Sequence, residues 1–68
     1  MEGYTQRQVK QLQTLAHRRG PFELACQTCW VFGTFQARLE ARGFLKAHKG
    51  HETRLAVPGP EGKGIERV

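Results

Sequence analysis

Residues 22–32 read FELACQTCWVF, and this stretch decides the fold. Its first half, residues 22–26, alternates large apolar side chains with smaller or polar ones, and residues 30–32 are rich in strand-forming types. The two segments flank the sequence Cys26-Gln27-Thr28-Cys29. We therefore expect two short strands joined by a hairpin that turns at the cysteines.

The segment after this hairpin predicts a helix over residues 35–49. Gly33 breaks the strand pattern, and the hydroxyl of Thr34 can cap a helix that starts just after it. Gly43 costs about 1 kcal/mol relative to alanine inside a helix, so a kink or an early stop at that point remains open. The side chains available to the inner face of this helix are Phe35, Leu39, Ala41, Leu45 and His48.

Two histidines stand at the end of this expected helix. Lys49-Gly50 gives the helix a basic last turn and then a residue that can adopt the left-handed conformation, which would turn His51 back toward His48. With the cysteines they form the pattern C-x2-C-x18-H-x2-H. Structural zinc sites take four sulfur or nitrogen ligands in a tetrahedron. We therefore expect a Zn2+ ion bound by Cys26, Cys29, His48 and His51, although the pattern does not distinguish zinc from iron.

The size of the chain favours such a metal site. The chain has 68 residues, of which 38% are hydrophobic, and can therefore form one domain. In domains of this size the hydrophobic core alone rarely supplies more than about 3–5 kcal/mol of stability. A disulfide between Cys26 and Cys29 would close a very small loop and restrict the unfolded chain little. A bound metal is therefore the expected source of the remaining stability.

Other uses of these residues remain open. The cysteines could be an inert pair and the histidines ordinary surface residues, a combination that requires no metal. A thioredoxin-like redox role for Cys26 and Cys29 fits less well, because the chain lacks the length and the βαβ units of that fold. His17 is a further candidate ligand, but it stands beside Arg18 at the expected end of a helix.

Residues 22–51 resemble the two-cysteine, two-histidine (C2H2-type) zinc fingers, in which a hairpin bears the cysteines and a helix bears the histidines. The resemblance implies a structural zinc ion and, for tandem fingers, a helix that reads DNA in the major groove. The spacing diverges, since the family has about twelve residues between the inner ligands and about three to five between the histidines. The helix is therefore expected to be longer by roughly a turn and a half, and a single divergent finger does not imply base reading.

The rest of the chain adds one helix and one strand. Thr5 and Gln8 fit a capping box, and apolar side chains continue from there at helical spacing, which predicts a helix over residues 5–19. Residues 53–57 predict a third strand. We expect an α+β fold in which residues 5–57 form a single zinc-stabilised domain, residues 1–4 a flexible N-terminus and residues 58–68 a disordered tail.

The net charge of +5 is concentrated on the two expected helices. Because such a basic field typically neutralises phosphates, nucleic acid, either DNA or RNA, is the first partner we expect. A solvated face kept soluble by charge is an equal alternative. Trp30, Phe32 and Phe35 could stack on bases, although a domain of this size often needs them in its core. The candidate nucleic-acid-binding residues are Arg7, Lys10, Arg18 and Arg19 on the first helix, and on the second Arg38, Arg42, Lys46 and Lys49, which form one stripe at helical spacing.

A protein-interaction adaptor or dimerisation module, with a purely structural zinc, is the alternative function. The helix at residues 5–19 would then use Val9, Leu12 and Leu15 to contact a larger protein or a second copy of the chain. The strand at residues 53–57 offers a second route, because an exposed edge there could accept an added strand.

An enzyme is not expected, and neither is a small-molecule substrate. Four protein ligands leave a zinc ion no open position, and no carboxylate lies in a recognisable supporting motif, so Glu23, Glu40 and Glu52 are expected to be solvated or ion-paired. No apolar run approaches the length of a membrane span, and residues 1–4 lack the apolar core of a secretory signal. We therefore expect no membrane partner and a cytoplasmic location, where reducing conditions keep the cysteines free for metal.

Overall fold

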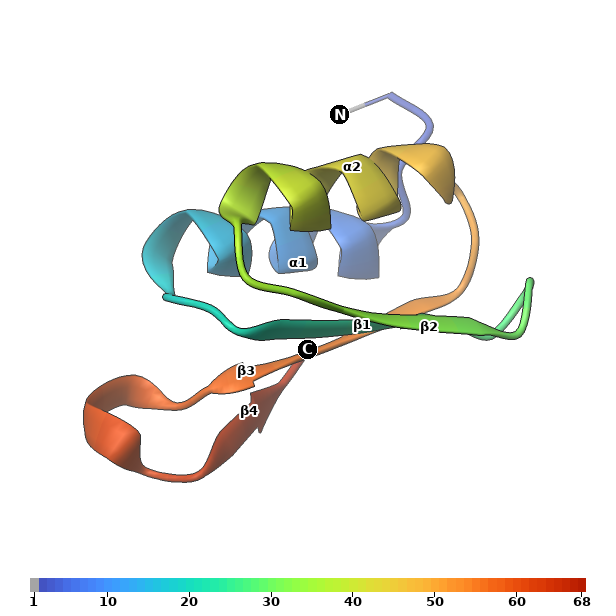
Figure 1. The fold of residues 1–68 in the computed structure, drawn as a ribbon. Coiled ribbons are helices and arrows are strands. Elements are labelled where there is room, and N and C mark those ends of the chain that lie inside the picture. Colours follow the sequence, from blue (N-terminus) through green and yellow to red (C-terminus); the bar gives the residue numbers. More distant parts are fainter. Residues whose placement is uncertain (1) are drawn as a thin grey trace.

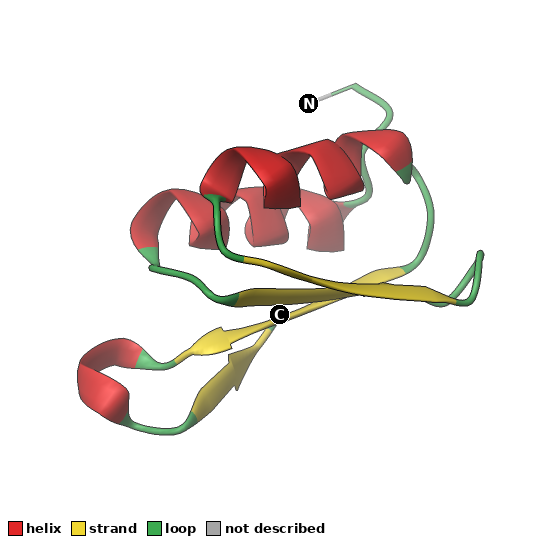
Figure 2. Ribbon diagram, in the orientation of Figure 1, coloured by secondary structure: helices red, strands yellow, loops and turns green. Residues whose placement is uncertain are grey.

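Two helices cover one face of a four-stranded antiparallel sheet in the computed structural model, which describes residues 2–68 (Figures 1 and 2). The strand order is β2-β1-β3-β4. The predicted α+β class is therefore confirmed, with one strand more than expected. The elements are α1 (Gln6–His17), β1 (Phe22–Cys26), β2 (Val31–Phe35), α2 (Arg38–Ala47), β3 (Thr53–Pro58), the 3-10 turn η1 (Pro60–Gly62) and β4 (Ile65–Arg67).

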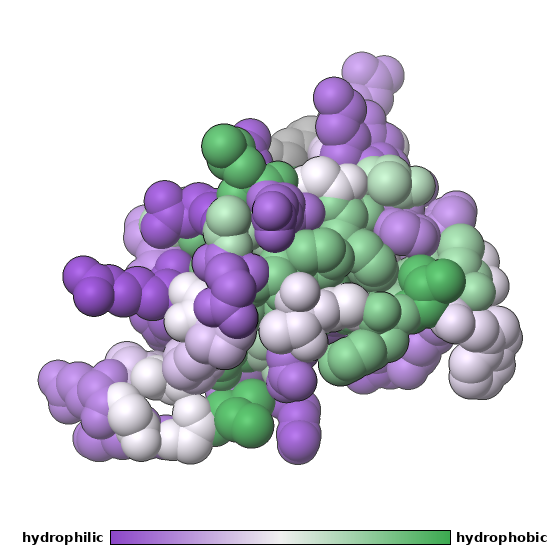
Figure 3. Space-filling model, in the orientation of Figure 1, coloured by the Kyte–Doolittle hydropathy of each residue, from purple (hydrophilic) through white to green (hydrophobic). Residues whose placement is uncertain are grey.

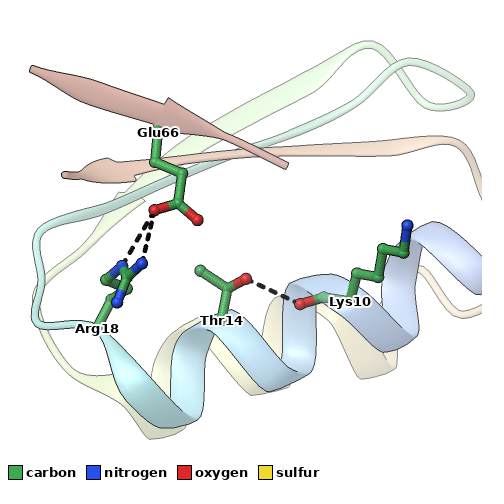
Figure 4. Close-up of polar contacts among 4 residues, drawn as sticks. All are labelled: Lys10, Thr14, Arg18 and Glu66. Atoms are coloured by element: carbon green, nitrogen blue, oxygen red, sulfur yellow. Dashed lines mark hydrogen bonds and ion pairs between the residues drawn. The ribbon is translucent and has the colours of Figure 1, made fainter. Parts of the chain in front are cut away.

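The capping box at the start of α1 is confirmed. Thr5 Oγ1 accepts a hydrogen bond of 3.0 Å from the Gln8 backbone N–H, and the Thr5 N–H donates one of 3.0 Å to Gln8 Oε1. The helix ends at His17, two residues before the predicted end, because Arg18 is extended (φ −113°, ψ 161°). The Arg18 side chain instead reaches β4, where its Nε and Nη2 donate to Glu66 Oε2 at 3.1 and 2.9 Å (Figure 4).

The second strand is longer than predicted and displaces the start of the second helix. β2 continues through Gly33, which faces Leu24 of β1, to Phe35, which faces Phe22. The expected break at Gly33 and the expected cap at Thr34 are therefore wrong. Pairing with β1 overrides the breaking tendency of glycine, and a Cβ at Gly33 would lie only 2.9 Å from the Phe35 ring, which covers that position.

The second helix spans residues 38–47 rather than 35–49. Its N-cap, Ala37, makes no side-chain capping bond, and its C-cap is His48. The helix continues through Gly43 without a stop. Ala41 and Leu45 are buried as predicted, whereas Leu39 is 75% exposed, so its predicted place on the inner face is wrong.

The core lies between the sheet and the helices. Three polar side chains, Gln8, Gln11 and Thr53, are also fully buried, and hydrogen bonds satisfy them. On the buried face of α1, Gln8 and Gln11 therefore take part of the place that the sequence assigned to apolar residues. The buried hydrophobic residues are Leu15, Phe22, Leu24, Cys26, Ala41, Leu45, Leu55 and Val57.

The expectation of a disordered tail over residues 58–68 is wrong. The proline- and glycine-rich segment forms the turn η1, and β4 then pairs antiparallel with β3, with Val57 facing Glu66. The backbones of Leu55 and Val68 also exchange hydrogen bonds of 3.0 and 2.8 Å. Sequence composition alone does not detect this strand, because it is three residues long and depends on pairing with β3.

Residues before α1 also contact the rest of the domain. Met1 lies outside the described residues, but Tyr4 is half-buried against the core. The ammonium group of Lys49 lies 4.8 Å from the centre of the Tyr4 ring. Over residues 2–68, none of the helices combines the length and the apolar character that crossing a membrane requires.

Candidate metal centre

The predicted metal ligands converge at one end of the molecule. The β1–β2 hairpin tip, which carries the cysteines, and the end of α2, which carries the histidines, both lie on the right of Figure 1. One ligand atom each from Cys26, Cys29 and His48 can be chosen so that all lie within 4.8 Å of one another, so these three residues could hold a metal ion. His51 is not one of these three, but its Nδ1 lies 3.4 Å from Cys29 Sγ and 3.6 Å from Cys26 Sγ.

The two distances from His51 Nδ1 to the sulfurs match those expected between ligands of one tetrahedral zinc ion. With Zn–S bonds of about 2.3 Å and Zn–N bonds of about 2.0–2.1 Å, a sulfur and a nitrogen ligand lie about 3.6 Å apart. Both His51–sulfur distances are close to that value. The cysteines are free thiols, one buried and one exposed, so the site lies at the protein surface with one side turned toward the core.

The hairpin tip is shaped by an unusual backbone conformation. Trp30, directly after Cys29, has a φ of +57°, in the left-handed region that costs a non-glycine residue about 1–2 kcal/mol. This conformation turns the chain back into β2 directly after the second cysteine. The Trp30 side chain is 90% exposed, so packing does not compensate for the strain.

Two hydrogen bonds attach the histidine loop to the hairpin tip. The Gln27 N–H donates to the carbonyl oxygen of Glu52 at 2.8 Å, and the Glu52 N–H donates to Thr28 Oγ1 at 3.1 Å. Gly50 has a φ of +82°, which confirms the predicted left-handed turn between the histidines. Residues between the cysteines and directly after His51 therefore hold the two halves of the site together.

Aromatic contacts and one hydrogen bond orient the His48 ring. Its Nδ1–H donates to the carbonyl oxygen of Phe44 at 2.8 Å, so Nε2 is the nitrogen left for a metal. The His48 ring also stacks on the Phe44 ring, with ring centroids 4.2 Å apart. The Phe44 ring in turn packs against the Phe35 ring, with ring centroids 5.6 Å apart. Phe44 was not predicted in this role from the sequence, although its position four residues before His48 places both on one helix face.

Gln8 of α1 is a second residue that the sequence analysis missed at the site. Its side-chain Nε2 donates to the His48 carbonyl oxygen at 2.8 Å, and its Oε1 accepts from the Gly50 N–H at 2.9 Å. The spacing of Gln8 and Gln11 with Leu15, at steps of three and four, is the signal that could have placed both glutamines on the buried face.

The thiols influence each other electrostatically. Desolvation, together with the hydrogen bond and the charge of the neighbouring Cys26 sulfur, raises the pKa of the Cys29 thiol above its ordinary value. The two sulfurs lie within 4.8 Å of each other. Because two negative charges at that distance repel, both thiols are expected to ionise readily only when a cation lies between them.

The eight basic residues predicted to bind nucleic acid do not form one surface. The stripe on α2 does come together, because Arg38, Arg42, Lys46 and Lys49 line an open groove of about 920 Å³ along the α1–α2 seam, here called the α1–α2 groove. Two of these are engaged, since Arg38 Nε donates to the Leu15 carbonyl oxygen and Lys49 lies over Tyr4. Outside this groove lie Arg7, Lys10, Arg18 and the exposed Arg19.

Comparisons with family models, with curated proteins and with solved structures find no match to this chain. The resemblance to C2H2 zinc fingers therefore rests on this chain's own cysteine and histidine pattern and on the ligand geometry. The geometry gives a hairpin with two cysteines and a helix that ends at a histidine.

Proposed function

We propose that the chain is a structural zinc domain in which one Zn2+ ion is bound by Cys26, Cys29, His48 and His51. The observation that carries this proposal is the position of His51 Nδ1, 3.4 and 3.6 Å from the two sulfurs, next to the group formed by His48 and both cysteines. Two thiolates and two imidazoles are a donor set that suits zinc. Four protein ligands leave no position for a substrate, so we assign the metal to stability rather than to catalysis.

The metal would join parts of the chain that the small core holds weakly. The ligands come from the end of β1, from the β1–β2 turn and from the segment between α2 and β3, and this last segment is far in sequence from the other two. Among residues 2–68, eight hydrophobic residues are buried. Binding energy at a structural zinc site, about 10–16 kcal/mol in finger peptides, is folding energy.

The test is native mass spectrometry of the purified protein with elemental analysis, before and after chelation. We expect one zinc per chain, lost on chelation and restored by added Zn2+. Replacement by Co2+ should give the absorption of a tetrahedral site with two thiolates. If the protein contains iron instead of zinc, the identity of the metal in the proposal is wrong but the site stands. A native protein without any metal would contradict the proposal.

We further propose that the α1–α2 groove binds the phosphates of nucleic acid. Support comes from the four cations that line it, of which Arg42 and Lys46 are exposed side chains on one stripe of α2. Duplex binding should weaken steeply with salt. The variant pair Arg42→Gln and Lys46→Gln should lower the slope of log K against log salt by about 2, since each phosphate contact contributes about 0.9.

The control is a pair of substitutions outside the groove that removes the same charge, Arg19→Gln and Lys63→Gln. It should leave the slope of log K against log salt within about one unit of the wild-type value. Arg38 is kept in both variants because its bond to the Leu15 carbonyl supports the packing of the helices. If both pairs weaken binding equally, the groove is not the site, and if no salt-dependent binding exists, nucleic acid is not the partner.

The adaptor alternative has less support. β3 lies between β1 and β4, and Leu55 and Val57 are both paired with C-terminal residues, so these two residues offer no free edge for strand addition. Of the stripe proposed for α1, Leu15 is fully buried and Leu12 packs against the core, so the domain itself uses most of that stripe.

A further inference from the structure

The face of the sheet turned away from the helices carries exposed hydrophobic side chains. Both helices lie on the other face (Figure 2), and strand alternation directs Phe32, Ala25 and Ala56 outward. Phe32, on the edge strand β2, is 68% exposed, and Ile65, on the opposite edge strand β4, is 62% exposed. Phe32 is therefore not used in the core, which removes the main objection to a role in binding. Figure 3, which views the sheet from its β2 edge, shows hydrophobic surface along that edge.

This face contains a hollow of about 310 Å³, here called the sheet hollow. The small residues Ala25 and Ala56 form part of its lining, and Ala25 faces both Phe32 and Arg54 across the strands. A volume of this size is at the lower end of the range of about 300–1,000 Å³ found for small-molecule sites. The charged residues that line it are Arg7, Glu23, Arg54 and Arg67.

We propose that the sheet hollow binds an unpaired base of a single-stranded nucleic acid. The base stacks on the Phe32 ring, the guanidinium groups of Arg54 and Arg67 contact the flanking phosphates, and the Glu23 carboxylate accepts a hydrogen bond from a base amino or imino group. Bases in a duplex are already stacked and paired, so an exposed aromatic side chain on a sheet suits unpaired bases.

The charge at the hollow favours an anionic occupant. Three arginines and one glutamate line the hollow. An apolar protein surface docked there would leave these charged side chains without partners. Arg54 also lies 3.6 Å from Glu52, but both side chains are more than half exposed, and such pairs hold a guanidinium only weakly. Arg54 can therefore turn to a phosphate at little cost.

This inference is independent of the α1–α2 groove, because none of the groove residues lines the hollow. It concerns a different surface and a different form of nucleic acid. The two proposals can therefore fail separately, and the experiment is designed to tell which one does.

The test is fluorescence anisotropy of the zinc-loaded protein with three labelled probes at one salt concentration. The probes are an oligothymidylate of about ten nucleotides, the same backbone without bases, and a duplex of equal length. We expect the oligothymidylate to bind more tightly than the abasic strand, and Phe32→Ala to weaken its binding by about 5- to 150-fold, the factor that corresponds to one stacked base. The abasic strand should bind both proteins equally.

Two variants control this result. Phe32→Tyr keeps an aromatic ring and should retain most of the affinity, whereas Ile65→Ala lies on the same face but outside the hollow lining and should leave it unchanged. Phe32 is mostly exposed, so unchanged zinc content and melting temperature will verify that Phe32→Ala is folded.

Three outcomes would overturn the inference: equal binding of the abasic strand and the oligothymidylate, no effect of Phe32→Ala, or self-association that Phe32→Ala abolishes in a protein that binds no oligonucleotide. Loss of duplex binding by the Arg42→Gln and Lys46→Gln variant, with the base-dependent binding retained, would support both proposals at once.

Discussion

The side-chain amide of Gln8 donates a hydrogen bond of 2.8 Å to the carbonyl oxygen of His48. This bond joins the first turn of α1 to a candidate metal ligand forty residues later. The same side chain accepts from the Gly50 N–H at 2.9 Å, so one glutamine holds both sides of the turn between the histidines. The candidate metal site is thus supported by a helix that has no counterpart in the resemblance to a zinc finger.

Replacing this glutamine should weaken metal binding as well as stability. Gln8→Ala leaves the His48 carbonyl and the Gly50 N–H without their partner, at a cost of about 1–3 kcal/mol for each unsatisfied group that stays buried. Zinc affinity, measured by competition with a chelator, should fall by about 10- to 100-fold, as for other residues that orient a ligand.

Two controls separate this effect from general loss of helix stability. Thr5→Ala removes the cap of α1, which is worth about 1 kcal/mol, without touching the histidine loop. Gln13→Ala changes an exposed glutamine on the same helix. If Thr5→Ala lowers zinc affinity as much as Gln8→Ala, Gln8 acts only through the helix.

The fourth ligand can be tested by comparing two histidines. His51→Ala should lower zinc affinity by more than about 100-fold, since residues that merely support a ligand already contribute about 10- to 100-fold. His17→Ala should leave affinity unchanged, because His17 lies at the end of α1 with Lys10 and Arg18, away from the cysteines. Unchanged zinc affinity in His51→Ala would reduce the site to Cys26, Cys29 and His48.

The core can be tested with two leucines of α2. Leu45 is fully buried, so Leu45→Ala should reduce the free energy of unfolding of the zinc-bound protein by about 2–5 kcal/mol. Leu39 is 75% exposed, and Leu39→Ala should change it by no more than about 0.5 kcal/mol. Denaturant unfolding measures both, and equal costs would mean that the helix is rotated relative to the structure described here.

The ion pair between Arg18 and Glu66 attaches the C-terminal strand to α1 (Figure 4). Both side chains are about a third exposed, at 32% and 34%, so Glu66→Gln should cost only about 0.2–1 kcal/mol. The cost should shrink at high salt. Hydrogen exchange of the Val68 amide, which donates to Leu55, should accelerate in Glu66→Gln but not in the control Glu61→Gln. Equal exchange in both variants would mean that the pair does not hold β4.

The sequence allowed the local parts of the fold to be predicted well. The capping box at Thr5, the hairpin that turns at the cysteines and the left-handed Gly50 are each set by neighbouring residues, and the structure confirms all three. The three residues that could hold a metal ion, Cys26, Cys29 and His48, were found by a different signal, the spacing of metal-binding residue types along the chain.

Features set by distant parts of the chain could not be predicted in this way. Gly33 reads as a breaker but is held in β2 by its partner Leu24. The strand β4 exists through pairing with β3, and Gln11 reads as polar surface but bonds to Thr53 and Val68 in the interior. These features depend on tertiary contacts that override local propensity.

Thermal unfolding followed by circular dichroism, with and without metal, tests the central claim most directly. The zinc-loaded protein should melt cooperatively, and after complete chelation the cooperative transition should disappear or move down by tens of degrees, as expected when metal binding at about 10–16 kcal/mol drives folding. Added Zn2+ should restore it. An unchanged, sharp transition in the metal-free protein would contradict the account, because the core and the glutamine contacts would then suffice to hold the fold.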